Sequence, residues 1–320
     1  MALFAVTGAA GFIGSHLVDA LLRAGHDVRG LDDLSSGRAE NVDRRCDLTV
    51  GDVADPVAVR KLLRGTAGCF HLAAIASVTR GNEQWRDTHR INQTGTVTVL
   101  EAAAEAGRLP VVYASSAAVY GDVGHVAAHE ECRPAPLTAY GADKLGSELH
   151  ARVGFIVHGV PSLGLRFFNV YGPRQDASSP YSGVISIFSE RIANGSMVTV
   201  YGNGAQTRDF VYVSDVVTHL IAGMRHVAAH PGAMVLNVAT GRGTSLLKLV
   251  DILSGIHERV PLVTHGLVRA GDISQSIGDV SRCVATLGIR ADVTLEEGLT
   301  EMSAKGPPGV RPRLRVASNA

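Results

Sequence analysis

The sequence contains few of the residues on which disulfide-stabilised or metal-stabilised proteins depend. Among its 320 residues there are 4 cysteines and 1 tryptophan. The cysteines, Cys46, Cys69, Cys132 and Cys283, show no CxxC spacing. This scatter is typical of reduced thiols in a cytosolic enzyme, and we expect neither a disulfide framework nor a metal site.

Excess charge and long apolar runs are also lacking. The 30 basic and 30 acidic residues leave no net charge, whereas a nucleic-acid-binding protein normally has a basic excess. The longest apolar runs fall far short of the roughly 20 residues that a membrane span requires. The first residues, Met1–Val6, show neither the charged nor the apolar region of a signal peptide. We therefore expect a cytoplasmic protein without nucleic-acid or membrane partners.

Glycine is abundant, with 36 residues, and it punctuates an alternation of short apolar runs with helical patterns. Such alternation predicts βαβ units and an α/β fold built on a doubly wound parallel (Rossmann) sheet. The predicted strands are 3–7, 27–31, 68–72, 110–114 and 162–168, and the predicted helices are 13–24, 57–63, 89–106 and 140–157.

The alternation weakens after about residue 170, which predicts a second and smaller unit. We expect a Rossmann domain over residues 1–170, with parts of about 210–240 packing back on it. A smaller C-terminal substrate-binding lobe is expected over 171–305, with helices at 245–253 and 295–303. The basic, proline-rich end, residues 306–320, is predicted to be a flexible tail.

A glycine motif lies between the first predicted strand and the first predicted helix. Gly8, Gly11 and Gly14 form Gly-x-x-Gly-x-x-Gly, where a phosphate would meet unpaired N–H groups at the helix N-terminus. Asp32 follows at the end of the second predicted strand, where a carboxylate accepts hydrogen bonds from ribose hydroxyls and repels a 2′-phosphate. Glycine turns also serve plain helix–strand packing, but this context indicates a dinucleotide site and favours NAD over NADP.

A tyrosine and a lysine stand one helical turn apart in the last predicted helix of the Rossmann domain. Tyr140 and Lys144 share one helix face, and an ammonium near a phenol stabilises the phenolate. Lys144 is one of only four lysines in the chain, which makes generic surface charge a weaker explanation. Ser116 follows the predicted strand 110–114 and is interpreted either as a turn cap or as a group that reaches a substrate oxygen.

Taken in order, these features resemble the extended short-chain dehydrogenase/reductase family over residues 3 to 302. Within that family the chain is most similar to the UDP-glucose and UDP-N-acetylglucosamine 4-epimerases. The resemblance is carried by Gly8–Gly14, Asp32, His71–Ala74, Ser116, Tyr140–Lys144, Leu165–Gln175, Gln206–Val213 and Arg269–Asp272.

The resemblance implies an isomerase that uses NAD to epimerise C4 of a UDP-hexose through a transient 4-keto sugar. Tyr140 would be the general base on the 4-hydroxyl, and Ser116 would hydrogen-bond the same oxygen. Lys144 would hold the nicotinamide ribose and lower the pKa of Tyr140. The resemblance also implies a homodimer, in which the helices 89–106 and 140–157 of two subunits form a four-helix bundle.

The resemblance further implies which residues bind the two ligands. Asp52 and Val53 would contact the adenine, Arg208 and Arg269 would clamp the diphosphate, and Asp272 would bind the uridine ribose. The implied cofactor-binding residues are Gly8, Gly11, Phe12, Ile13, Gly14, Asp32, Asp33, Asp52, Val53, Leu72, Ala73, Ala74, Tyr140, Lys144 and Phe167. The implied substrate-binding residues are Ser116, Tyr140, Asn169, Arg208, Arg269, Asp272 and Ser276.

Several positions distinguish this chain from relatives that catalyse other reactions. Ala117 and Ala118 occupy the positions where similar sugar dehydratases carry an acid and a base. Asp176 stands where epimerases of uronic acids have an arginine, which favours a neutral hexose. The small Ser276 leaves room for an N-acetyl group at C2. Ile75 replaces a common glutamine and departs from the usual sugar-recognition pattern.

Two other functions remain open from the sequence. The first is a nucleotide-sugar 4-ketoreductase or dehydrogenase, which would release its cofactor in each cycle and often use NADP. The second is a non-catalytic NAD-sensing protein on the same fold. Asp32 argues against NADP, and the intact pair of Tyr140 and Lys144 argues against a sensor.

Overall fold

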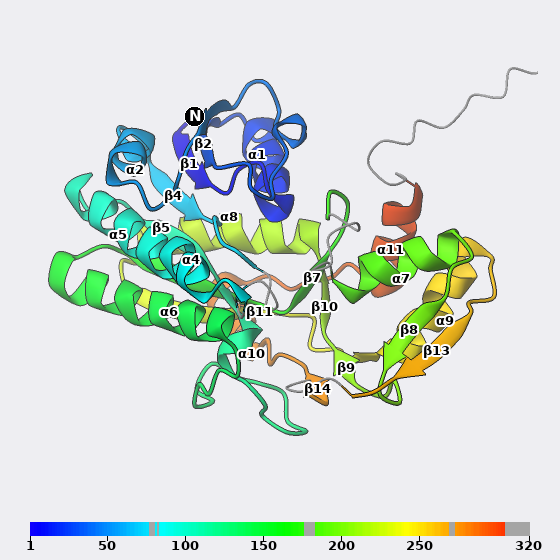
Figure 1. Ribbon diagram of the computed structural model, residues 1–320. Coiled ribbons are helices and arrows are strands. Elements are labelled where there is room, and N and C mark those ends of the chain that lie inside the picture. The colour runs from blue at the N-terminus through cyan, green and yellow to red at the C-terminus, as the bar shows by residue number, and fades with distance from the viewer. Residues whose placement is uncertain (77–80, 82, 176–182, 269–272, 305–320) are drawn as a thin grey trace, which may run out of the picture.

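In this computed structural model (Figure 1), the described residues form a main sheet of seven parallel strands, in the order β11-β6-β5-β4-β1-β2-β3. The structure describes residues 1–76, 81, 83–175, 183–268 and 273–304. Strand order reverses between β1 and β4, so the loops that follow these two strands open a crevice at the carboxyl edge of the sheet. The strands are Leu3–Thr7 (β1), Asp27–Asp32 (β2), Asp47–Val50 (β3), Gly68–His71 (β4), Val111–Ser116 (β5), Ser162–Phe167 (β6) and Ala233–Val238 (β11). The predicted doubly wound parallel fold is confirmed.

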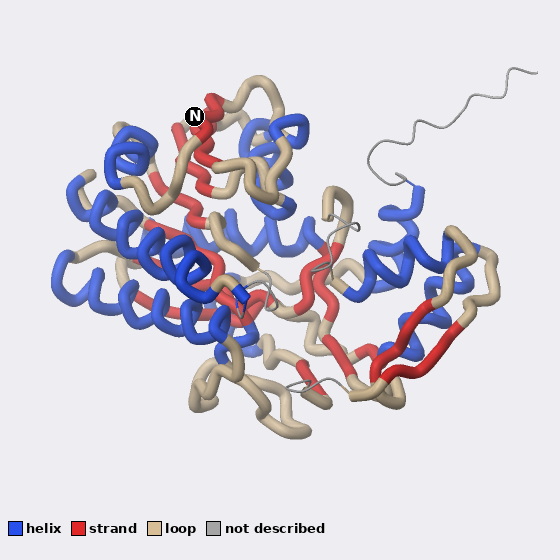
Figure 2. Tube along the Cα trace, in the orientation of Figure 1, coloured by secondary structure: helices blue, strands red, loops and turns tan. Residues whose placement is uncertain are grey.

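Helices cover both faces of this sheet (Figure 2). On one face α1 packs beside α8, and on the other α5 packs between α2 and α6. The helices are Phe12–Arg23 (α1), Pro56–Leu63 (α2), Trp85–His89 (α4), Gly95–Glu105 (α5), Ala139–His158 (α6) and Val213–Ala229 (α8). Because both faces are covered, the central strands β4 and β6 are buried along their whole length and are mostly apolar.

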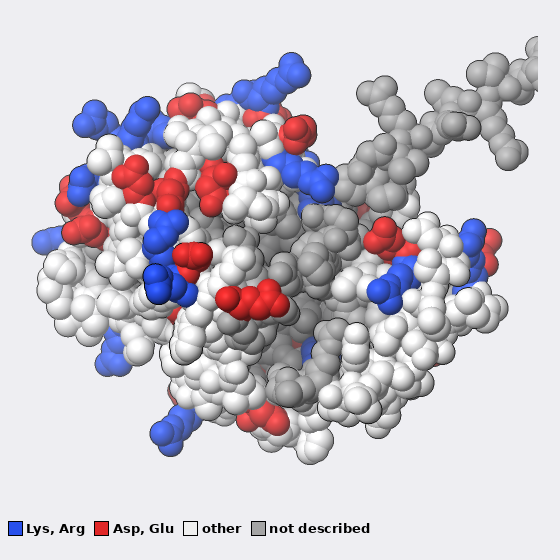
Figure 3. Space-filling view, viewed as in Figure 1, with Lys and Arg blue, Asp and Glu red and all other residues white. Residues whose placement is uncertain are grey.

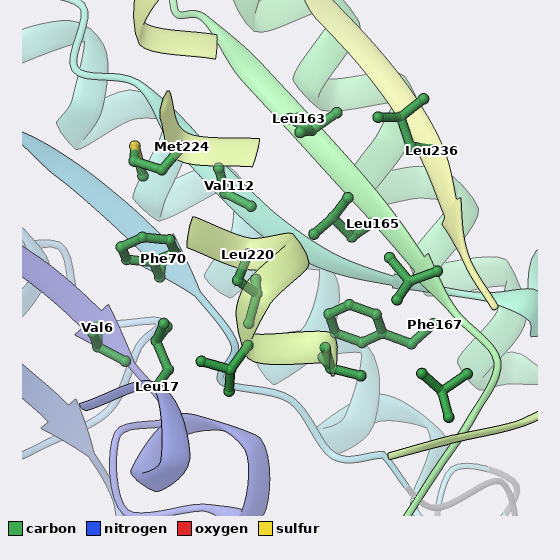
Figure 4. Packing of buried hydrophobic residues seen from close by; sticks show 14 of the residues in the cluster. Val6, Leu17, Phe70, Val112, Leu163, Leu165, Phe167, Leu220, Met224 and Leu236 are labelled. Atoms are coloured by element: carbon green, nitrogen blue, oxygen red, sulfur yellow. The ribbon is translucent and has the colours of Figure 1, made fainter. Parts of the chain in front are cut away.

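The side chains of each strand alternate between two apolar cores. Val6, Phe70 and Val112 point toward α1 and α8, where Leu220 and Met224 lie over the strands (Figure 4). Their strand neighbours, such as Ala5, Cys69 and Val111, belong to the core beneath α2, α5 and α6. This alternation follows from the two-residue period of a β-strand.

The described residues of the C-terminal lobe form two small sheets of two strands, one of three strands, and three helices. Its strands are Asn169–Tyr171 (β7), Val198–Tyr201 (β8), Thr207–Arg208 (β9), Phe210–Tyr212 (β10), Thr244–Ser245 (β12), Val263–Gly266 (β13) and Gln275–Ser276 (β14). Its helices are Val184–Ala193 (α7), Leu246–His257 (α9) and Leu295–Ala304 (α11). A third core links them, and Phe12 and Ile13 of α1 pack against it, so the nucleotide helix also supports this lobe.

The chain crosses between the two lobes more than once. After β10 it returns to the main sheet as α8 and β11, and β11 pairs with β6. It then enters the C-terminal lobe again through β12 and α9. The helix Ser281–Leu287 (α10) packs back on α8 and β11. Residues 305–320, which include the predicted tail, lie outside the described residues.

The helix predicted over 89–106 is interrupted in the structure. Residues Arg90–Thr94 form a π-helical turn between α4 and α5. The side chain of Asn92 holds this turn, because it accepts from the backbone N–H of Ile75 and donates to the carbonyl of the same residue. Such turns are frequent at functional sites, and this one contacts the loop that follows β4.

A buried ion pair ties α6 to the sheet. Arg166 on β6 donates from Nε and Nη2 to the two carboxylate oxygens of Glu148 on α6, at 2.8 and 2.7 Å. Ser115 donates to the same carboxylate, and the Arg166 guanidinium lies 4.7 Å from the ring centroid of Tyr120. Burial opposes the charge, but Glu148 more than compensates and raises the pKa of Arg166.

The described part of the chain contains no helix that is both long and apolar enough to cross a membrane. Figure 3 shows lysine and arginine side chains interspersed with acidic ones over the visible face of the described residues.

Candidate active site

The loop between β1 and α1 is held by glycines that leave no room for side chains. Gly8 has φ of +69°, and a Cβ there would lie 2.7 Å from the backbone nitrogen of Ala73. A Cβ on Gly14 would lie 1.9 Å from the carbonyl oxygen of Gly8. The loop therefore folds tightly onto the start of α1 and presents its backbone to the crevice, as a phosphate site requires.

A pocket follows this loop along the crevice between β1 and β4. It brings together most of the residues that the sequence predicts for cofactor binding: Gly8, Gly11, Phe12, Ile13, Gly14, Asp32, Asp33, Val53, Leu72, Ala73 and Ala74. The lining residues that sequence reasoning missed are Leu31, Ser35, Ser36, Gly51, Ile75, Ala76, Ile91 and Ala114. The two serines follow the paired aspartates after one leucine, Leu34, and this polar cluster is the signal that the sequence offers for them.

Asp32 stands at the carboxyl end of β2, as predicted. Its carboxylate accepts hydrogen bonds from the backbone N–H groups of Ala10 and Leu34, both at 2.9 Å. Burial raises its pKa, and these two hydrogen bonds oppose the rise. Because each carboxylate oxygen has a second lone pair, Asp32 can still accept from ribose hydroxyls in the pocket.

Four predicted cofactor residues do not line this pocket: Tyr140 and Lys144, which are described below, and Asp52 and Phe167. The carboxylate of Asp52 accepts from Arg90 at 2.5 Å and from the backbone N–H of Ala54 at 2.8 Å, while its neighbour Val53 lines the pocket. Phe167 is buried in the core beneath α1 and α8 and does not line the pocket. That Asp52 and Phe167 contact the cofactor stays a prediction.

Ser116, Tyr140 and Lys144 come together at the end of this pocket. The Lys144 ammonium donates at 2.8 Å to the carbonyl of Ala114, which lines the pocket, and lies 5.8 Å from the Tyr140 ring centroid. Ser116 ends β5 and hydrogen-bonds Tyr140. The hydroxyl of Ser116 also accepts a hydrogen bond from the backbone N–H of Ala118. Ser116 therefore caps a turn, and this is compatible with its predicted contact to a substrate oxygen.

Burial controls the acid–base properties of this group. It raises the pKa of the Tyr140 phenol, and the hydrogen bond with Ser116 opposes the rise. It lowers the pKa of Lys144 to about 8, and the neighbouring Asp143 carboxylate limits the fall. The family resemblance implies that Lys144 lowers the pKa of Tyr140. This stays a prediction, and it concerns the site with a positively charged nicotinamide bound.

The predicted substrate residues gather only in part. Arg208 on β9 pairs with Ser276 on β14, and Arg208 also donates to the carbonyl of Ile273 at 3.0 Å. Asn169 is exposed at the start of β7. Arg269, Asp272 and Asp176 lie outside the described residues.

A residue without a predicted role, Asp209, holds the strands of this region together. Its carboxylate is fully buried and accepts from the backbone and hydroxyl of Thr240, from Gly241 and from Gly278. Burial raises the pKa of Asp209, and these hydrogen bonds oppose the rise. Because Asp209 follows Arg208 directly, it fixes the backbone that carries the predicted diphosphate clamp.

The glycine cradle, the acidic residue at the end of β2 and the crevice at the switch point define a dinucleotide-binding enzyme of the Rossmann class. The model of the NAD dependent epimerase/dehydratase family matches residues 4–239, and the chain belongs to that family. The predicted family and the predicted cofactor, NAD, are confirmed.

Individual relatives share almost the whole length of the chain. A UDP-glucose 4-epimerase from Mycolicibacterium smegmatis is 37% identical over 303 residues, which cover 92% of this chain and 96% of the relative. A solved UDP-glucose 4-epimerase from Thermotoga maritima, with UDP-glucose, has a TM-score of 0.88 at 34% identity and covers 94% of this chain and 97% of its own. A UDP-N-acetylglucosamine 4-epimerase from Methanobrevibacter ruminantium M1, in complex with UDP-N-acetylmuramic acid, also has a TM-score of 0.88, at 33% identity, covering 94% and 96%.

The tight glycine loop gives a direct prediction for cofactor binding. Gly14→Ala forces the loop away from α1. We therefore expect NAD binding to weaken at least tenfold, which corresponds to ~1.4 kcal/mol. The same substitution should destabilise the fold by about 1–3 kcal/mol. NAD titration calorimetry and denaturation measure the two effects. In Gly255→Ala, the new Cβ on α9 meets open space, so this control should be neutral or stabilising by about 0.5–1 kcal/mol. If Gly14→Ala bound NAD with wild-type affinity, the glycine loop would not be the phosphate-binding site.

Proposed function

We propose that the protein is an NAD-dependent 4-epimerase of UDP-hexoses, acting on UDP-glucose and UDP-galactose and also on their N-acetylated forms. The observation that carries the proposal is the group formed by Ser116, Tyr140 and Lys144 at the end of the dinucleotide pocket. The relatives named above, which are 4-epimerases of UDP-sugars, support the same reaction.

Each side chain of this group has a distinct task in the proposed reaction. Tyr140 takes the proton of the sugar 4-hydroxyl, and Ser116 holds that oxygen by a hydrogen bond. When bound, NAD would supply the hydride acceptor for C4 and the hydride donor to the opposite face of the 4-keto sugar, and the glycine loop, Asp32 and Lys144 would hold it in place. Tyr140 then gives its proton back to the oxygen, so the reaction is redox-neutral overall. Lys144 holds the nicotinamide ribose and adds positive charge beside the phenol.

The turn after Ser116 distinguishes epimerisation from elimination of water. Ala117 and Ala118 form the start of a 3-10 turn that Ser116 caps. Neither side chain can donate or accept a proton, so nothing in this turn supports the acid and base steps of dehydration. No feature of the described site favours a net oxidoreductase or a sensor over the epimerase.

The division of labour between the lobes is part of the proposal. Residues 1–170, with the returning segment of about 210–240, hold NAD, and residues 171–305 hold the UDP-sugar. Arg208 clamps the diphosphate with a rigid bidentate donor, and Asn169 binds the sugar or the diphosphate. Their places on β9 and β7, in strand pairs that meet through Asp209, support these roles.

Product analysis without added reductant tests the function. The purified protein is incubated separately with UDP-galactose and with UDP-N-acetylgalactosamine, and the products are separated. We expect the C4 epimer in each case, with no net NADH, and the ratio of rates gives the preferred sugar. Net NADH formation, or failure on both substrates with NAD bound, would contradict the proposal.

Ser276 is proposed to leave room for the substituent at C2 of the sugar. Ser276→Tyr should therefore lower kcat/KM for UDP-N-acetylgalactosamine by about 10–100-fold and leave UDP-galactose nearly unaffected. Ser276→Ala keeps the small size and is the matched control, for which we expect both substrates to be retained. An equal loss on both substrates in Ser276→Tyr would count against a gate at this position.

We further propose that the protein is a homodimer formed by α5 and α6. Leu149, Val153, Ile156 and Val157 lie on one face of α6 and are at least half exposed, and exposed Val97 lies on the neighbouring α5. Two copies of such a face would bury each other in a four-helix bundle.

Ile156→Glu, which places a charge on a side chain that is 67% exposed, should convert the dimer to a folded monomer. Light scattering after size-exclusion chromatography gives the mass. Val260→Glu is the control, because Val260 is 93% exposed in the C-terminal lobe. A monomeric wild type, or an unchanged mass in Ile156→Glu, would refute this interface.

We place the protein in the cytoplasm. The support is its cysteines, which are all free thiols: Cys46, Cys69 and Cys283 are buried, and Cys132 is partly buried. Burial raises the pKa of Cys46 to about 11 and that of Cys69 and Cys283 to about 12, so these thiols stay protonated and unreactive.

A further inference from the structure

Four buried polar side chains form a continuous series between the wall of the nucleotide pocket and helix α6. Thr7 Oγ1 lies 2.8 Å from His71 Nδ1, and His71 Nε2 lies 3.1 Å from Thr96 Oγ1. Thr96 Oγ1 lies 3.1 Å from Ser147 Oγ. These residues come from β1, β4, α5 and α6, and all four are buried. We call this series the threonine–histidine relay.

The hydrogen-bond partners fix the direction of the two bonds that His71 makes. Thr7 Oγ1 already accepts from the backbone N–H groups of Leu72 and Ala73, which fill its two acceptor sites, so its proton goes to His71 Nδ1. The Thr96 hydroxyl donates to the Asn92 carbonyl at 2.6 Å and must therefore accept from His71 Nε2–H. His71 is thus a neutral imidazole with its proton on Nε2. The third bond joins two hydroxyls, and because Thr96 gives its proton to the Asn92 carbonyl, Ser147 must be the donor in it.

A charged His71 would break this pattern. It would offer a proton on Nδ1 to a threonine oxygen whose acceptor sites are both in use. Burial, together with the smaller effect of the nearby Lys144 ammonium, lowers the pKa of His71 to about 3. His71 therefore stays neutral, with its proton on Nε2, near neutral pH.

The two ends of the relay lie on opposite walls of the proposed active site. At one end, Thr7 holds the N–H groups of Leu72 and Ala73, which line the nucleotide pocket against Gly8. At the other end, the Ser147 hydroxyl shares its one proton between Thr96 Oγ1 and the backbone carbonyl of Asp143, which lies 3.0 Å away. Asp143 is the residue next to Lys144. Thr96 joins the two ends beside the π-helical turn.

We propose that the threonine–histidine relay is a positioning device that sets Tyr140 and Lys144 on α6 relative to the nicotinamide end of the pocket. It goes beyond the family's reactive group, because none of its four side chains lines the pocket or touches the reacting atoms. This inference rests on the proposed function, since α6 carries the proposed base. The four residues are positioning residues. Thr96 connects the two walls because it hydrogen-bonds both His71 and Ser147.

Helix α5 offers a matched pair for the test. Thr96 and Thr98 are both buried threonines whose hydroxyls donate to the carbonyl four residues earlier, but only Thr96 belongs to the relay. We expect Thr96→Val to lower kcat for UDP-galactose about 10–100-fold with an unchanged KM, because α6 is displaced relative to the cofactor. Thr98→Val should keep kcat, and Thr96→Ser, which restores the hydroxyl, should recover most of it. If Thr96→Val does not fold, Ser147→Ala replaces it in the test. Ser147→Ala removes the hydrogen bond between Thr96 and Ser147 and should show the same loss of kcat.

Equal losses in Thr96→Val and Thr98→Val, or no recovery in Thr96→Ser, would overturn the proposal, as would a change confined to KM. A second readout does not depend on turnover. ¹⁵N NMR of histidine-labelled protein should show His71 protonated on Nε2 only, with no titration between about pH 5 and 8, the range in which an ordinary histidine changes charge. A titrating His71, or a proton on Nδ1, would overturn the relay even in an active enzyme. If the wild type does not epimerise UDP-sugars but His71 shows the expected tautomer, the proposed function fails and the relay stands.

Discussion

Tyr140→Phe is expected to lower kcat for epimerisation of UDP-galactose by about 10²–10⁴-fold, the range that a positioned acid–base group contributes. The substitution removes the phenolic oxygen that we propose takes the 4-hydroxyl proton, and it leaves the ring in place beside Lys144. Because Tyr140 does not line the nucleotide pocket, NAD should stay bound with little change in affinity.

The measurement combines steady-state turnover with binding of NAD and of UDP-galactose by calorimetry. Tyr113→Phe is the matched control, since Tyr113 is a buried tyrosine on β5, the strand that ends in Ser116. Tyr113→Phe also loses a buried phenolic hydroxyl, but it should keep the wild-type kcat. Near-wild-type kcat in Tyr140→Phe would assign the base to another group.

Arg166→Met is expected to destabilise the protein by about 3–5 kcal/mol, because it leaves the Glu148 carboxylate buried without its partner. The side chains of Arg166 and Glu148 are only 4% and 7% exposed, so water cannot replace the lost bonds. Methionine replaces the apolar stem of arginine but not the guanidinium, so loss of the charge and its hydrogen bonds is the dominant effect.

Urea denaturation measures this loss as a lower midpoint with an unchanged slope. The control is Arg60→Met, which breaks an ion pair with Glu105 in which both side chains are about half exposed. Exposed pairs contribute about 0–1 kcal/mol, so the two variants should differ clearly. Similar midpoints for both would mean that Glu148 finds other partners or takes up a proton.

The nucleotide half of the site was accessible from the sequence because its determinants are local. Gly8, Gly14 and Asp32 each lie where a strand meets the next element, and the apolar runs on either side mark those strands. The pair of Tyr140 and Lys144 was accessible for the same reason, since helical spacing alone places both on one face of α6. The edge strand β3 was missed because its four residues are only partly buried or exposed and give no apolar run.

The connections between elements could not be predicted. Thr7, His71, Thr96 and Ser147 are separated by tens of residues, and a lone threonine or serine carries no signal of its partner. Asn92 illustrates the same limit: its two hydrogen bonds to the backbone of Ile75 accompany a π-helical turn where periodicity predicts a continuous helix. The role of Asp209 depends on Thr240 and Gly278, which lie 31 and 69 residues away from it in the sequence.

The repeated passage of the chain between its lobes restricts how such an enzyme can acquire a new substrate. An exchange of the sugar-binding part between two relatives would have to replace at least 169–212 and 244–276 together, and leave α8 and β11 in place between them. A single recombination point cannot do this. Diversification of this architecture is therefore expected to proceed by point substitutions in the short strands and loops, while the order of segments in the gene stays fixed.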